Sequence, residues 1–178
     1  RDAGASFRSA ARRAPSVRSR AAMPAPTMPE YGFSPDGNFP VCYAEKGIYI
    51  ITVKIPKLKN FSSLSGGTVI NAVCAHATAV CNENALDKTL LNELGLNLEN
   101  GNQIHSYGVS AHGSHPERGK NAIKPLFEYF LSKGECVKDI LDCLFYDLGG
   151  IGKLISEQGP TTISPDLLSE DKNGVYIA

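Results

Sequence analysis

The chain has 178 residues, of which 42% are hydrophobic, and this is enough for one domain with a real core. No run of about eighteen apolar residues occurs, which predicts that no segment spans a membrane. The 18 basic and 18 acidic side chains cancel, but six arginines lie within residues 1–29, so the rest is mildly acidic and lacks the basic patch that nucleic acid requires.

Residues 1–29 form a tail rich in arginine, alanine and proline, with too few apolar side chains to bury. We expect this tail to be disordered. Three interpretations stay open for it: an incidental flanking segment, a targeting peptide, or an arm that binds nucleic acid. Targeting peptides are rich in arginine and serine and poor in acids. The nucleic-acid interpretation is weak because the body of the chain adds no basic patch.

The first half of the body predicts two strands and a helix. Residues 47–55 are rich in β-branched side chains and predict a strand, and apolar residues on both of its faces indicate a central place in a sheet. Residues 66–80 predict a second strand with an irregular start. Leucines at helical spacing predict a helix over residues 84–94, which Gly95 ends.

A hairpin is predicted next, because Asn100 and Gly101 form a turn signal before the strand predicted over residues 103–109. An apolar stripe then predicts a helix over residues 121–133. Pro125 lies inside this stripe, so the helix either begins near residue 122 or bends there.

The segment just before this helix and the remainder of the chain give further signals. Ser114 and Glu117 have the spacing of a capping box. Residues 137–148 predict another helix, and residues 161–169 and 175–178 predict two short strands joined by a turn at Asp171–Gly174. Strands and helices mix without βαβ regularity, which predicts an α+β fold, an antiparallel or mixed sheet with helices on one face.

One histidine stands out by its local setting. His112 follows the strand predicted over residues 103–109 and precedes the helix predicted over residues 121–133. Gly113 and Gly119 permit backbone angles that other residues avoid. The pattern therefore predicts an imidazole at the mouth of a strand-to-helix turn, where it can point outside the domain.

The segment Ser110-Ala-His-Gly-Ser-x-Pro-Glu-x-Gly-x-Asn121-Ala122 resembles the lid-domain signature of the PepV-type dipeptidases, dinuclear zinc metallopeptidases related to carnosinases and aminoacylases. Tyr31–Pro40 resembles the segment where the catalytic domain of those enzymes joins the lid, and Gly66–Val73 resembles a lid strand. The resemblance implies a junction at residues 30–46 and a ferredoxin-like lid domain, incomplete at its C-terminus, at residues 47–178.

The resemblance also implies roles for three residues. His112 matches the lid histidine that stabilises the oxyanion of the scissile carbonyl, and Asn71 matches the asparagine that helps to bind the substrate. Asp36 matches a zinc-binding aspartate just before the lid. The sequence departs from the family after Asn71, where the usual Asn-x-Val-Pro is replaced by Asn-Ala-Val-Cys.

The implied activity is that of a metal-dependent dipeptidase with two zinc ions. The sequence has no His-x-Asp motif and no Glu-Glu pair, so we expect this chain to lack most of the metal site and to be inactive alone. Its partners would be a dipeptide and the missing catalytic domain. Five cysteines without a C-x-x-C pair indicate a reduced, cytoplasmic protein. The alternative is a non-catalytic binding module that retained the lid fold.

Overall fold

The computed structural model describes residues 46–178, so the predicted tail, the junction up to residue 45 and Asp36 lie outside the described part. One sheet contains β1 (Val53–Ile55), β2 (Phe61–Gly66), β3 (His76–Cys81), β4 (Asn97–Glu99), β5 (Gln103–Tyr107), β8 (Leu168–Asp171) and β9 (Gly174–Ile177), and a separate hairpin contains β6 (Ile155–Ser156) and β7 (Gly159–Pro160). The α-helices are α1 (Lys88–Glu93), α2 (Ile123–Ser132) and α3 (Lys138–Ile140). Short helical segments of other types are η1 (Glu83–Ala85), η2 (Pro116–Arg118), the π-helix η3 (Leu141–Phe145) and η4 (Ile151–Lys153).

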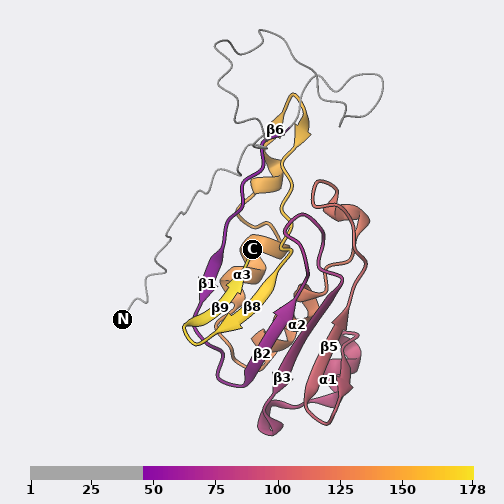
Figure 1. Ribbon diagram of the computed structural model, residues 1–178, viewed down its shortest axis with the longest axis vertical. Coiled ribbons are helices and arrows are strands. Elements are labelled where there is room, and N and C mark those ends of the chain that lie inside the picture. Colours follow the sequence, from indigo (N-terminus) through magenta and orange to yellow (C-terminus); the bar gives the residue numbers. More distant parts are fainter. Residues whose placement is uncertain (1–45) are drawn as a thin grey trace, which may run out of the picture.

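The large sheet has the strand order β1-β9-β8-β2-β3-β5-β4, and every neighbouring pair is antiparallel. Figure 1 shows α2 and α3 behind this sheet, and α2 packs against β3 and β5. The predicted α+β class, with a sheet and helices on one face, is confirmed. No helix within residues 46–178 is long and apolar enough to cross a membrane.

The first predicted strand is shorter than expected and lies at an edge of the sheet. Only Val53–Ile55 form β1, which pairs with β9 alone within the described residues. Ile48 and Tyr49 are 77% and 87% exposed. The prediction of a central strand is therefore wrong, because a β-branched run does not reveal whether other strands lie on both sides of it.

The strand predicted over residues 66–80 is two strands, β2 and β3, joined by a loop over residues 67–75. Gly67 has φ +71 and turns the chain out of β2, so Asn71 lies in the loop and not in a strand. Most of β2 escaped prediction because its serines face solvent and only Phe61, Leu64 and Gly66 are buried.

The next predicted elements are partly confirmed. The helix predicted over residues 84–94 is interrupted, because Asp87 caps a new helix by accepting a hydrogen bond from the Leu90 amide at 3.1 Å. The hairpin between β4 and β5 is confirmed, and Asn100 and Gly101 have the positive φ values of 50° and 83° that this tight turn needs.

The start of α2 resolves the position of Pro125. The helix begins at Ile123, so the proline lies in the first turn, where its missing amide has no intrahelical partner to lose. Asn121 Oδ1 accepts from the Ile123 amide at 2.9 Å. The predicted capping box is wrong, because the Glu117 carboxylate contacts the His115 ring and Ser114 contacts His112 instead.

The C-terminal elements are shorter than predicted. The helix predicted over residues 137–148 is confined to α3 and the π-helical η3, residues 138–145. The final hairpin is confirmed, but β8 begins at Leu168 and residues 161–167 are irregular. Its turn forms because Asp171 Oδ1 accepts from the amides of Asn173 and Gly174, a contact that the local sequence favours.

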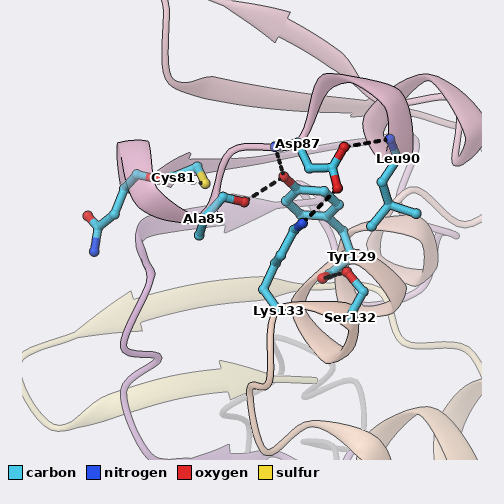
Figure 2. A network of polar contacts seen from close by, with 8 residues as sticks. Cys81, Ala85, Asp87, Leu90, Tyr129, Ser132 and Lys133 are labelled. Carbon is cyan, nitrogen blue, oxygen red and sulfur yellow. Dashed lines mark hydrogen bonds and ion pairs between the residues drawn. The ribbon is translucent and has the colours of Figure 1, made fainter.

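The core lies between the sheet and α2, and one tyrosine joins it to α1. Tyr129 is fully buried, and its hydroxyl donates to the Ala85 carbonyl at 2.9 Å and accepts from the Asp87 amide at 2.8 Å, as Figure 2 shows. Lys133 Nζ lies 3.0 Å from Asp87 Oδ2. Burial raises the pKa of the Tyr129 phenol. The Tyr129 hydroxyl therefore connects residues 85–87, which precede α1, to α2.

Replacing Tyr129 by phenylalanine should lower the free energy of unfolding by about 1–3 kcal/mol, because it leaves the half-buried Asp87 amide and the buried Ala85 carbonyl without this partner. Urea unfolding followed by circular dichroism measures the change. Tyr146→Phe is the matched control, since that hydroxyl bonds the Glu128 carboxylate on the surface, which raises its pKa to about 12. The control should change stability by less than about 0.5 kcal/mol, and equal effects would contradict the role of the Tyr129 network.

Candidate functional site

His112 and Asn71 lie on two loops that pair through their backbones. The Gly113 amide donates to the Asn71 carbonyl at 2.8 Å, and the Val73 amide donates to the Ala111 carbonyl at 2.9 Å. These bonds form an antiparallel bridge between Ala72 and His112. The structure thus brings together the two loops that carry the predicted oxyanion and substrate residues, and both side chains are exposed.

A second set of contacts ties the His112 loop to the sheet and to α2. Val109 and Lys120 exchange two backbone hydrogen bonds of 2.8 and 2.9 Å, and the Ala122 amide donates to the Cys74 carbonyl at 2.8 Å. A Cβ on Gly108 would overlap the Lys120 carbonyl oxygen. The loop over residues 108–120 is therefore closed at its base, and His112 forms its bridge with Ala72 of the residue 67–75 loop.

The hydrogen bonds of the His112 ring determine which nitrogen carries the proton. The Ser114 amide donates to Nδ1 at 3.1 Å, and the Ser114 hydroxyl lies 2.7 Å from the same nitrogen. A backbone amide can only donate, so Nδ1 is the acceptor and the neutral ring carries its proton on Nε2. No hydrogen-bond partner for Nε2 is present among residues 46–178, so this N–H can donate to a ligand.

A third segment meets these loops at Asp166, a residue that the sequence analysis did not select. Asp166 is 3% exposed, its Oδ1 accepts from the Ser164 hydroxyl, and its Oδ2 lies beside Gly113. Burial raises the pKa of the Asp166 carboxyl, while the hydrogen bond from Ser164 and the charge of the protonated form of His112 oppose part of that rise. An aspartate after a proline is an ordinary turn signal, so the local sequence could not indicate this position.

A groove of about 460 Å³ runs along the residue 67–75 loop, and its lining includes Gly67, Ala72, His76 and Ser110. This volume falls within the range of small-molecule sites. A larger hollow of about 540 Å³ lies between α1 and β4, at Lys88 and Glu99. We favour the smaller groove as a binding surface because its wall contains Ala72, next to Asn71, and Ser110, two residues before His112.

The described residues do not fit a dinuclear zinc centre. Within residues 46–178, no group of three or more histidine, cysteine, aspartate or glutamate side chains could hold a metal ion. Asp36, the predicted ligand, lies outside this part of the chain. The arrangement at His112 can therefore bind and polarise a carbonyl group through hydrogen bonds, while its own residues offer no metal site.

No protein-family model matches the chain. A search of curated proteins finds similarity to the Bacillus subtilis (strain 168) protein named "Putative dipeptidase YtjP", with 35% identity over 120 residues. The match covers 57% of this chain and 26% of the relative, so the chain spans about a quarter of that protein. The chain is thus similar to a dipeptidase-like protein.

Proposed function

We propose that residues 47–178 are the lid of a metal-dependent dipeptidase and that His112 donates a hydrogen bond to the scissile carbonyl oxygen. The observation that carries the proposal is an exposed imidazole with a free Nε2–H, held by backbone pairing beside Asn71. The similarity to a dipeptidase-like protein supports the same reaction class.

The chemistry of this contact follows from the charge that develops during amide hydrolysis. The carbonyl oxygen becomes negative in the tetrahedral intermediate, and a donor positioned beforehand stabilises it more than it stabilises the neutral substrate. The Ser114 amide occupies Nδ1, so the ring does not need to exchange tautomers before Nε2–H donates. His112 thus acts as an electrostatic stabiliser in the proposal.

Asn71 is the proposed substrate contact. Its backbone carbonyl is used by the Gly113 amide, while its exposed side-chain amide is free to offer both a donor and an acceptor to a dipeptide. The pairing of Ala72 with His112 keeps the two side chains on adjoining loops. A short peptide lying along these loops would contact both residues.

The two zinc ions of the proposal belong to a catalytic domain outside residues 46–178, with Asp36 as one ligand. Such ions generate a hydroxide nucleophile from bound water. The roles proposed for His112 and Asn71 concern only hydrogen bonds to the substrate, so they can be tested separately from the metal content.

The direct test is to extend the reading frame in both directions and assay the product. We expect the 178-residue chain to show no zinc-stimulated hydrolysis of β-alanyl or Xaa-His dipeptides, and the extended product to hydrolyse them in the presence of zinc. Ninhydrin detection of released amino acids measures both. Turnover by the chain alone would contradict the lid role, and an inactive, correctly folded extended product would contradict the dipeptidase.

A second candidate function is a binding module that docks on another chain. The observation in its favour is the exposed segment before β1, where Ile48, Tyr49 and Ile51 present large apolar side chains beside an edge strand. A transcript with a stop codon directly after Ala178, whose product extended upstream shows no dipeptidase activity, would favour this candidate.

A further inference from the structure

We propose that Asp166 is a positioning residue for His112, because its buried carboxylate lies against the Gly113 peptide and supports the loop that presents the imidazole. The predicted effect of Asp166 on catalysis rests on the proposed function, whereas its predicted effect on the position of the His112 ring does not. Asp166 contacts no substrate in this proposal and acts only through His112.

The carboxylate of Asp166 lies close to Gly113, in the residue 108–120 loop. A Cβ added to Gly113 would lie 3.4 Å from Asp166 Oδ2 and 3.3 Å from the Asn71 carbonyl oxygen. The Asn71 backbone and the Asp166 carboxylate therefore both lie close to the space that a side chain at Gly113 would occupy. Because His112 precedes Gly113 directly, a displacement of this peptide would move the imidazole as well.

The backbone of Asp166 is anchored on two sides. Its amide donates to the Ala178 carbonyl at 2.7 Å, and the Ala178 amide donates to the Leu167 carbonyl at 3.0 Å, next to β9. The Asp166 carbonyl packs against Gly67 at the start of the residue 67–75 loop. Three segments that are distant in the sequence therefore meet at this residue, which gives the carboxylate a fixed place.

The charge of Asp166 is costly for the fold. Its carboxylate accepts a hydrogen bond from the neutral hydroxyl of Ser164, and burial raises the pKa of Asp166 because the charged form loses hydration. The ionisable groups that interact with it are His112, from the residue 108–120 loop, and the buried Cys74 thiol, from the residue 67–75 loop. An asparagine would make the Ser164 contact at lower cost, so packing alone does not explain a carboxylate.

The interaction with His112 supplies a use for this charge. The imidazole lowers the pKa of Asp166, so the two groups lie within electrostatic reach of each other, although they form no direct ion pair. A carboxylate nearby favours the cationic form of an imidazole, and a cationic donor stabilises an oxyanion more strongly than a neutral one. Asp166 would then both support the loop and polarise its histidine.

The test compares Asp166→Asn with Glu135→Gln by nuclear magnetic resonance of the 178-residue chain. Glu135 is the matched control, since it is also a buried carboxylate but accepts hydrogen bonds from the amides of Lys59 and Asn60, not from the site. We expect Asp166→Asn to shift the His112 ring signals and the Gly113 amide signal, and Glu135→Gln to leave them unchanged. Unchanged His112 signals in Asp166→Asn would overturn the proposal.

A reciprocal variant keeps the proposal testable even if Asp166→Asn fails to fold. In His112→Gln the titration midpoint of the Asp166 carboxyl carbon should rise, because the imidazole charge that lowers the pKa of Asp166 is gone. An unchanged midpoint would show that the two groups are not coupled. Ser164→Ala leaves the imidazole in place and serves to separate loss of a hydrogen bond from loss of that charge.

The pH dependence of the free energy of unfolding tests whether Asp166 is charged while it is buried. The folded-state pKa of Asp166 is raised, so its favourable contribution is complete below the unfolded pKa and is lost as pH rises through the folded pKa. Asp166→Asn removes that loss, so its stability relative to the parent chain should increase between acid and neutral pH. A constant difference would argue against a charged, buried Asp166.

The catalytic consequence is measured in the extended product. Asp166→Asn should lower kcat by roughly tenfold, with little change in KM and none in zinc content. If the extended product is no dipeptidase, the resonance measurements still decide whether Asp166 positions His112. If it is a dipeptidase and kcat is unchanged while the ring signals move, the polarising role is wrong.

Discussion

Replacing His112 by alanine in the extended product should lower kcat by about 10²–10³-fold, the usual cost of removing one oxyanion donor. The reason is that Nε2–H is free while Nδ1 is occupied by Ser114, so the ring can offer one directed hydrogen bond to the substrate. KM should change little, because the bond strengthens as charge develops on the carbonyl oxygen. Steady-state kinetics with a saturating dipeptide measures both constants.

His115→Ala is the matched control for this experiment. His115 lies in the same loop, is exposed, and its ring contacts the Glu117 carboxylate on the surface. This variant should keep kcat within about twofold, because surface ion pairs contribute little. Zinc content, measured by atomic emission, should stay equal in all variants. Loss of zinc in His112→Ala would reassign the residue as a metal ligand, and equal losses of kcat in both variants would contradict the oxyanion role.

Replacing Gly67 by alanine should destabilise the fold by about 3 kcal/mol or more, through two additive effects. Gly67 has φ +71, a region that costs an L-residue about 1–2 kcal/mol. The new Cβ would also overlap the carbonyl oxygen of Asp166, a backbone atom held in place by the contacts of residues 166 and 167 with Ala178. Urea unfolding at neutral pH measures the loss.

Gly95→Ala separates the two effects. Gly95 has nearly the same backbone angle, φ +68, but a Cβ there meets nothing within 4 Å. It should cost only the conformational term of about 1–2 kcal/mol. The excess loss in Gly67→Ala then measures how tightly the residue 67–75 loop packs on Asp166. Equal losses in the two variants would mean that this contact relaxes freely.

The expected effects of His112→Ala and Gly67→Ala are linked through Asp166. Gly67 packs against the backbone carbonyl of Asp166, and the carboxylate of Asp166 lies beside Gly113. Gly67→Ala in the extended product should therefore lower activity as well as stability, whereas Gly95→Ala should affect stability alone. Gly67 directly follows β2 and Gly95 lies two residues after the end of α1, but only Gly67 is near the site.

Local signals predicted much of the fold, and their failures have physical causes. Turn residues at Asn100–Gly101 and at Asp171–Gly174 predicted both hairpins, because these turns form from contacts within four residues. The edge position of β1 and the presence of β2 could not be read in this way. Neighbouring strands far along the chain decide which face of a strand is buried, and periodicity does not identify those neighbours.

For the candidate site, the local sequence indicated an imidazole followed by a glycine, just before a helix, in a motif that resembles a lid signature. Its catalytic role stays a prediction. Only the tertiary structure decided that the His112 loop pairs with Asn71, that Ser114 occupies Nδ1, and that Asp166 lies beneath Gly113. The contacts with Asn71 and Asp166 join segments about 40–55 residues apart, and no local pattern encodes them because they arise from packing of the whole sheet. The Ser114 contact spans two residues but depends on the orientation of the ring.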